Sequence, residues 1–257
     1  MPDSTIEDRD MNESDSTELK HGMVTIPPSR GSYAIEKGLL LEWEVVAMEG
    51  GKNFPDVKAG LAHDFPGVDE PQKLIPIPPQ LPPIDPPADG LILSGGQSDR
   101  RKCVNLTDDG IIEEITKNGT GKAEKWPRLS VTRGAKFTVE WQYHAVHVTR
   151  GYRWFITKDG WDESTPITRA DFGGKNYVGD NHFTFGAHDG LMESEILDLS
   201  PFDKNRDKLQ PKKITSAELP IDKHGHHVIL LVWIVAETDK AFYQAFDVDF
   251  GPKPVSV

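Results

Sequence analysis

Apolar and polar side chains alternate through the middle of the chain with the period of a β-strand. Residues 137–148 read FTVEWQYHAVHV, and a strand there places every second residue from Phe137 to His147 on one face. Ala145 shares that apolar face. A further strand is predicted at 152–157, after the turn signal Arg-Gly.

The last third of the chain continues this pattern. Residues 227–236 are apolar on both faces, which is typical of a central strand. Residues 241–250 alternate again, with one apolar side formed by Phe242, Phe246, Val248 and Phe250. Short strands at this spacing predict an all-β fold, a β-sandwich of the immunoglobulin or fibronectin III type.

The first half carries weaker signals. Residues 39–48 form a short apolar run, whereas residues 50–90 are loop-like. Nine prolines fall within residues 66–87, a density that excludes helix and inner strand. We interpret this stretch as a long Pro-rich loop excursion of a single domain, and the pattern shows no amphipathic helix of convincing length.

The amino-terminal 20 residues differ from the rest in composition. Seven acidic and two basic residues give them a net charge of −5, with almost no apolar content. Such a segment cannot offset the entropy of ordering, so residues 1–20 are expected to be a disordered acidic tail or a leader that is removed. They lack the basic and apolar regions of a secretory signal. Residues 21–257 are expected to form one domain.

Charge and cysteine content exclude several classes. A net charge of −12 over 257 residues argues against nucleic acid as a partner. No apolar run approaches the roughly 18 residues of a membrane span. Cys103 is the only cysteine, which rules out an internal disulfide and a Cys-rich zinc site.

Two histidine groups invite a metal interpretation, each with an alternative. The cluster at 224–227 resembles a metal tract, but we interpret it as the entrance of a strand with His227 facing inward. Taken alone, His147 is interpreted as a buried hydrogen-bonded histidine rather than a ligand. No GxSxG, GxGxxG, Walker or HExxH pattern is present.

Seven blocks in order resemble the chitin-binding type 4 proteins, the bacterial-type (auxiliary activity family ten) lytic polysaccharide monooxygenases. They cover nearly everything from His21 to about Phe250. The blocks are HGMVTIPPSR from His21, EGGKNFP from Glu49, PADGLILS from Pro87, AVH from Ala145, WFITK from Trp154 with TRADF from Thr168, GHHVILLVW from Gly225 and AFYQA from Ala241.

The resemblance implies one copper ion per chain, held by the amino-terminal histidine through its α-amine and ring and by a second histidine ring. These ligands map onto His21 and His147, and imidazole and amine nitrogens suit copper. Phe242 falls on the apolar axial position, Ala145 on the small residue beside the metal, and Glu49 on a carboxylate that positions the oxygen species.

The resemblance also implies an exposed sugar-binding face. Trp43 matches a surface aromatic of that face, although it can also be a core tryptophan of a strand over 39–48. Glu237 and Thr238 match polar positions there. We assign the remaining tryptophans to packing: Trp126, Trp141, Trp154, Trp161 and Trp233.

The implied function is copper-dependent oxidative cleavage of insoluble chitin, with oxidation at C1, by a secreted monomer that takes electrons from an external donor. Relatives usually carry disulfides, which this chain cannot form. His21 follows Lys20, so the free amine requires cleavage between them. The alternatives are a non-catalytic chitin-binding or adhesion protein and a copper-binding stress or virulence protein.

Overall fold

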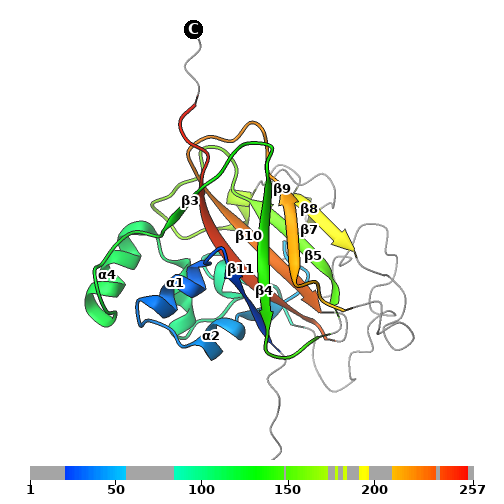
Figure 1. Cartoon of the computed structure of the whole chain (residues 1–257), viewed down its shortest axis with the longest axis horizontal. Helices are drawn as coiled ribbons and strands as arrows, with labels where there is room; N and C mark the ends of the chain where they lie inside the picture. The colour runs from blue at the N-terminus through cyan, green and yellow to red at the C-terminus, as the bar shows by residue number, and fades with distance from the viewer. Residues whose placement is uncertain are drawn as a thin grey trace, which may run out of the picture.

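A computed structural model describes most of the chain from residue 21 onward (Figure 1). The described residues are 21–55, 84–147, 149–172, 210–235 and 238–253, with the backbone of short strands at 177–178, 182–183 and 191–196. The acidic segment 1–20 and most of the proline-dense segment lie outside them.

The strands of the described chain are β1 (Gly22–Ile26), β2 (Glu49–Gly51), β3 (Arg128–Ser130), β4 (Lys136–Tyr143), β5 (Thr149–Ile156), β6 (Tyr177–Val178), β7 (His182–Phe183), β8 (Leu191–Ile196), β9 (Ile214–Glu218), β10 (His226–Val235) and β11 (Lys240–Asp249).

Two sheets pack face to face, which confirms the predicted β-sandwich. One sheet has the order β1-β4-β9. The other follows the order β2-β11-β10-β5-β8, with β3 paired to β11. The pair β6 and β7 forms a small ribbon of its own. In Figure 1, β4 and β9 cross in front of the larger sheet, while the helices lie to its left.

Strand β10 is buried on both faces, as its continuous apolar sequence predicts. Alternate residues enter two separate cores. Val228, Leu230, Val232 and Ile234 lie in the core beneath the helices. Ile229, Leu231, Trp233 and Val235 lie in the core between the two sheets. The larger sheet is therefore a buried layer, and both cores fix the positions of β10 and its neighbour β11.

Helical segments cover the larger sheet on the face away from β4. They are α1 (Arg30–Glu36), α2 (Glu42–Val46), α4 (Asp108–Asn118) and the 3-10 turns η1 (Ile92–Ser94), η2 (Arg100–Asn105) and η3 (Arg169–Phe172). The sequence reading missed α4, because only Ile111 and Ile115 of its 11 residues are buried. Its other signals are local: Thr107 caps the amino end and Lys117 lies in the last turn. No helix in the described part of the chain has the length and apolar content needed to cross a membrane.

A buried ion pair joins α1 to the larger sheet. The Arg30 guanidinium donates to both carboxylate oxygens of Asp247 in β11, at 2.6 and 2.8 Å. It also donates to the carbonyls of Val104 and Leu106 and stacks over the Trp126 ring. The His226 ring contacts Asp247 at 2.8 Å. Arginine satisfies this many acceptors only with its planar fork of donors, so this side chain fixes α1, and with it the end of β1, against β11.

Candidate functional site

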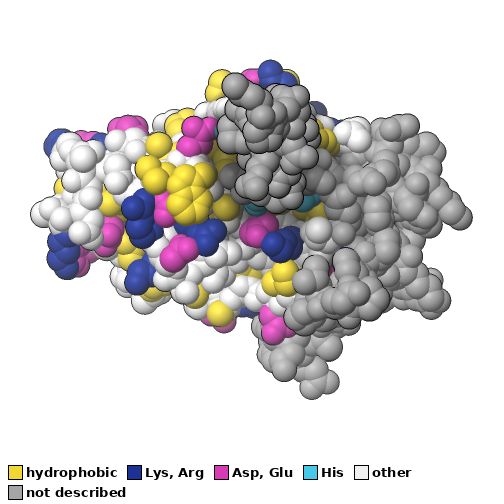
Figure 2. Space-filling view, turned by 90° about the horizontal axis from the view of Figure 1, so that it is seen from below, with side chains coloured by type: hydrophobic (Ala, Val, Ile, Leu, Met, Phe, Trp, Pro, Cys, Tyr) yellow, Lys and Arg dark blue, Asp and Glu magenta, His cyan; other side chains and the backbone are white. Residues whose placement is uncertain are grey.

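Three aromatic rings from distant parts of the chain converge at one end of the sandwich. The His21 and His147 ring centroids are 6.4 Å apart. The Phe242 ring lies 5.4 Å from the His21 ring and 5.6 Å from the His147 ring. Figure 2 shows histidine side chains on this face beside acidic and basic ones. The structure thus brings together two histidines that are 126 positions apart in the sequence.

Backbone hydrogen bonds join residue 21 to the turn that carries His147. The His21 carbonyl accepts hydrogen bonds from the amides of His144 and Ala145, at 2.8 and 3.2 Å. At the other end of the turn, the Thr149 hydroxyl donates to the His147 carbonyl at 3.0 Å and accepts from the Trp233 indole at 2.8 Å. The turn is therefore fixed at both ends by buried partners.

The strand predicted over 137–148 ends earlier than the sequence pattern indicates. Strand β4 stops at Tyr143, and Ala145 and His147 lie in the turn before β5 rather than on a strand face. Alternation continues past Tyr143 in the sequence, but the pairing partner β1 ends there, because Gly22 is paired with Tyr143 and residue 21 precedes β1. The turn frees the His147 ring to approach His21.

The His21 ring carries a nitrogen suited to a metal. Its Nδ1 atom is buried and has no hydrogen-bond partner. An orphaned buried acceptor of this kind is costly unless it binds something. Among the described residues, no cluster of three or more His, Cys, Asp or Glu side chains can hold a metal. Two imidazole rings are present here. The donor set fits copper, which takes imidazole and amine ligands.

A carboxylate and a lysine flank the histidine pair. The Glu49 carboxylate lies 3.7 Å from the Nε2 atom of His21 and 2.5 Å from the ammonium of Lys240. Burial opposes ionisation of Glu49, but the contacts with His21 and Lys240 outweigh it and lower the pKa of the carboxyl to about 2. Glu49 is therefore an anion, held in place from two sides.

Strand register explains why these groups meet. Glu49 in β2 pairs with Phe242 in β11, and Lys240 lies two residues before Phe242. Gly50, next to Glu49, allows β2 to lie close to the backbone of Gly95, because a Cβ atom at position 50 would lie 2.2 Å from the Gly95 carbonyl oxygen. The sequence analysis did not predict Lys240 as a residue of this site. Its signal was available, since residues two apart on a strand share a face.

Phe242 and Ala145 complete the immediate surroundings of the histidine pair. The Phe242 side chain is buried and stacks on Trp233, with 4.8 Å between their ring centroids. It offers an apolar wall without ligand atoms beneath both histidine rings. Ala145, partly exposed, presents only a methyl group beside His147.

Trp43 lies on the surface of a helix, not in the core of a strand. Residues 42–46 form α2, and 55% of Trp43 is exposed. Leu41, at the start of the helix, is 53% exposed. Figure 2 shows hydrophobic side chains gathered on the same face as the histidines. The His144 ring lies 3.0 Å from the Glu42 carboxylate, which connects this helix to the turn that carries His147.

The remaining candidate residues have mixed outcomes. Thr238 is partly buried, and its hydroxyl accepts a hydrogen bond from the Lys240 amide. Glu237 lies outside the described residues. His227 is buried and hydrogen-bonded to Thr157, which agrees with a strand entrance rather than a metal tract. His226 contacts the carboxylates of Glu163 and Asp247. Four of the tryptophans assigned to packing are buried, whereas Trp161 is partly exposed.

The chain is similar in sequence and fold to known proteins. A family profile described as "Lytic polysaccharide mono-oxygenase, cellulose-degrading" matches residues 21–248. A chitin binding domain from Burkholderia pseudomallei superimposes with a TM-score of 0.66 at 30% identity, covering 90% of this chain and 98% of that one. An AA10 lytic polysaccharide monooxygenase from Streptomyces lividans gives a TM-score of 0.54 at 25% identity, covering 90% and 100%.

The chain is also similar to curated sequences, but it covers only part of their length. The GlcNAc-binding protein A of Shewanella oneidensis is 27% identical over 243 residues, which are 91% of this chain. The chain spans only 36% of that relative's length and 26% of the related protein from Aliivibrio fischeri. The family profile begins to match at residue 21, which is also the first residue that the structure describes.

Proposed function

Because this chain belongs to the lytic polysaccharide mono-oxygenase family, we propose that it is a copper-dependent enzyme that cleaves chitin oxidatively. The observation that carries the proposal is the pair of histidine rings, 6.4 Å apart, with the Nδ1 atom of His21 buried and unpartnered. Copper would be held by both rings and by the nitrogen of residue 21.

The third nitrogen requires cleavage of the chain before residue 21. A peptide nitrogen is conjugated and protonated, and it is a poor ligand. A free amine on residue 21 forms a six-membered chelate with the Nδ1 atom of the same residue. Lys20 precedes His21, which suits a protease that cuts after basic residues. We propose that residues 1–20 are removed and that the mature protein acts outside the cell.

The chain's own residues would orient the reaction. Bound copper supplies one-electron redox chemistry, taking electrons from an external donor and using peroxide or dioxygen to hydroxylate a C–H bond of the sugar. With peroxide, one oxygen atom enters the C–H bond and the other leaves as water. Phe242 keeps other ligands away from one side of the metal site, and Glu49 offers a fixed anion beside His21. Charged groups held at such positions commonly tune a metal site.

The sugar polymer would lie across the exposed face. Trp43 offers an aromatic ring for stacking, a contact that suits the C–H faces of sugar rings. Chitin is favoured because the solved structure from Burkholderia pseudomallei is named for chitin binding and the Shewanella relative for GlcNAc binding. The family description names cellulose instead, so cellulose is the competing substrate. Oxidation at C1 is the expected outcome.

The decisive experiment uses protein trimmed to begin at His21, loaded with one equivalent of copper and incubated with β-chitin and ascorbate. Mass spectrometry should detect oligosaccharides ending in an aldonic acid. The matched control is the His147→Ala variant, which should release none. Equal product from both proteins would show that the reaction does not need His147 as a copper ligand.

A second function is supported by the names of the relatives and by the peptide bond that precedes His21. A chain that keeps this bond would bind chitin through the Trp43 face without oxidising it. Mass spectrometry of the protein isolated from its natural source separates the two functions, because a mature chain that starts at His21 is required only for catalysis.

A further inference from the structure

A single carboxylate separates the ammonium group of Lys240 from the His21 ring. The Nζ atom of Lys240 donates to the Oε1 atom of Glu49 at 2.5 Å. The other carboxylate oxygen, Oε2, lies 3.7 Å from the Nε2 atom of His21. The three groups form a row of cation, anion and imidazole, in which Glu49 turns one oxygen toward each neighbour. The family resemblance implies roles for His21 and Glu49 but none for Lys240.

The backbone on both sides of this ion pair is anchored. The Glu49 carbonyl accepts a hydrogen bond of 2.5 Å from the Gln97 side chain. The Thr238 carbonyl, two residues before Lys240, accepts one of 2.9 Å from the ammonium of Lys52, which is buried. The ion pair therefore joins two fixed segments of the chain, and only the side chains lose freedom when it forms.

Water screens this row of charges only in part. The exposed fraction is 38% for the side chain of Lys240, 23% for that of Glu49 and 15% for that of His21. Fully exposed charges interact weakly because water and salt screen them, whereas partly buried charges are screened less. The charge of Lys240 therefore acts at the His21 ring, where it opposes the charge of Glu49.

We propose that Lys240 is a positioning residue for Glu49 and that its positive charge offsets the carboxylate at the copper site. This inference rests on the proposed function. When an external donor gives one electron to bound Cu(II), no bond of the protein breaks and the charge of the site falls by one. An isolated carboxylate beside the site favours Cu(II), the ion of higher charge, whereas a cation there favours Cu(I). Lys240 thereby keeps reduction favourable beside the anion that Glu49 provides.

The test compares the relative affinity for Cu(I) and Cu(II) of the unaltered protein and the Lys240→Met variant. Both are trimmed to begin at His21, a form that retains every residue the structure describes. Loss of one partly exposed charge, one side chain away from a ligand, should lower the ratio of Cu(I) to Cu(II) affinity about three- to tenfold. Competition with chelators selective for each oxidation state measures this ratio. Spectroelectrochemistry measures it independently, because a tenfold change corresponds to about 59 mV for a one-electron couple.

Two further variants separate the charge of Lys240 from its shape. Lys240→Arg keeps a cation beside Glu49 and should keep the affinity ratio of the unaltered protein. The double variant Glu49→Gln/Lys240→Met removes both charges and should return the ratio toward that of the unaltered protein. A purely structural role for Lys240 does not predict this recovery.

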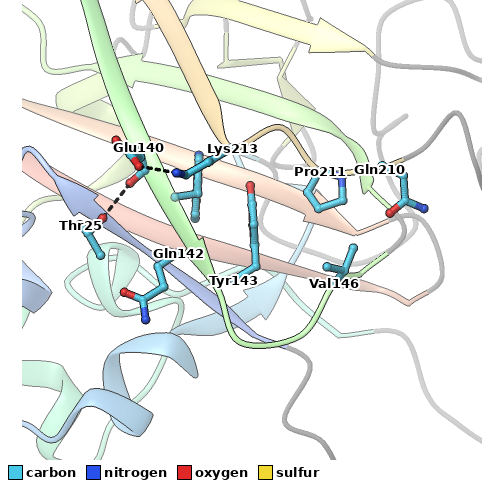
Figure 3. A pocket seen from close by; sticks show the side chains of 9 residues that line it. Thr25, Glu140, Gln142, Tyr143, Val146, Gln210, Pro211 and Lys213 are labelled. Atoms are coloured by element: carbon cyan, nitrogen blue, oxygen red, sulfur yellow. Dashed lines mark hydrogen bonds and ion pairs between the residues drawn. The ribbon is translucent and has the colours of Figure 1, made fainter.

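Lys213 provides a control with the same change of charge. It pairs with Glu140 at 2.9 Å on the smaller sheet, as a dashed line in Figure 3 shows. The partner of Glu140 in β1 is Ile26, which lies about 13 Å along the strand from Gly22, the neighbour of His21. That separation exceeds the Debye length of about 8 Å at physiological salt. Lys213→Met should therefore leave the affinity ratio unchanged.

Salt concentration gives a last readout. The effect of Lys240→Met should be smaller at about 0.5 M salt than at about 0.05 M, since added ions screen a partly exposed charge. The inference is overturned if Lys240→Met changes the ratio no more than Lys213→Met does, if its effect does not depend on salt, or if the double variant shows no recovery. Tight copper binding by the unaltered trimmed protein would then leave the proposed function standing. If that protein binds neither copper ion tightly, both are overturned.

Discussion

The backbone carbonyl of His21 accepts a hydrogen bond of 2.8 Å from the amide of His144. This bond places His21 through its carbonyl group and leaves its own nitrogen out of the contact. Residue 21 can therefore hold one position whether its nitrogen is an amide or a free amine. In the proposed copper site, the peptide bond to Lys20 would therefore change the ligand set without changing the backbone hydrogen bonds of residue 21.

Cleavage after Lys20 should create tight copper binding without a change in fold. Protein that begins at His21 should bind one Cu(II), and the uncut chain should bind far more weakly, because a conjugated, protonated amide nitrogen is a poorer ligand than a free amine. Isothermal titration calorimetry gives both affinities, and near-ultraviolet circular dichroism checks the fold. His147→Ala in the cut protein is the control that removes a ring ligand. Equal copper affinity of the cut and uncut chains would contradict the proposed role of the residue 21 nitrogen as a copper ligand.

Glu49→Gln should slow chitin oxidation while copper uptake stays nearly unchanged. The variant keeps the shape of the side chain but removes the negative charge beside His21 and Lys240. Changes to groups that support a metal site commonly cost about 10- to 100-fold in activity or affinity. Turnover on chitin and copper titration are measured on the same preparation, with Glu113→Gln on the surface of α4 as the control. A variant with full turnover would show that the charge has no part in the reaction.

Trp43→Ala should weaken chitin binding more than copper binding. The indole lies on α2, 55% of Trp43 is exposed, and it belongs to neither of the two cores. Aromatic stacking contributes about 0.5–1.5 kcal/mol, so the dissociation constant on chitin should rise about two- to tenfold. Depletion assays on β-chitin measure it, with Ile221→Ala as an exposed apolar control. Unchanged retention would mean that the polymer binds elsewhere.

Arg30→Met should destabilise the fold strongly. It leaves the fully buried Asp247 carboxylate without its main partner, and breaking a buried pair in this way costs about 3–5 kcal/mol. The double variant Arg30→Met/Asp247→Leu should recover part of that loss, because no unpaired charge remains. Urea unfolding of the two variants gives the comparison. A double variant less stable than Arg30→Met would show that the packing around this pair cannot accept apolar side chains.

The stability of the protein should decline in acid partly through Asp247. Burial opposes ionisation of this carboxyl, but the charges and hydrogen bonds of Arg30 and His226 outweigh it and lower its pKa to about 2. Between about pH 4 and pH 2 the unfolded chain takes up a proton that the folded protein does not. Stability from Asp247 is thus complete above about pH 4 and is lost as the pH falls through about 2, by an amount on the order of 2 kcal/mol.

Urea unfolding at several acidic pH values, with the Asp247→Asn variant as comparison, measures this loss of stability. The variant should be less stable at neutral pH and should lose less stability on acidification. Parallel pH curves for the two proteins would show that Asp247 titrates alike in the folded and unfolded states.

The apolar pattern predicted the β-sandwich and four of its strands, because a strand buried on both faces needs a continuous apolar run such as residues 227–236 and a half-buried strand needs alternation. The sequence also named His21, His147, Phe242 and Glu49 through ordered blocks that resemble a known family. The sequence did not predict where β4 ends, because alternation continues to residue 147. The antiparallel partner β1 begins at Gly22, which pairs with Tyr143, so β4 has no partner beyond Tyr143. The sequence also left Trp43 undecided between strand and helix, since a run as short as LLLEWEVV suits both.

Which of these side chains meet depends on how the strands pair and pack. The convergence of His21, His147 and Phe242 depends on the pairing of β1 with β4 and on β11 lying in the other sheet. The contact between Glu49 and Lys240 depends on the register of β2 against β11. Pairings of this kind join residues more than a hundred positions apart. Local sequence preferences do not encode such distances, which arise only when the two sheets pack around their common core.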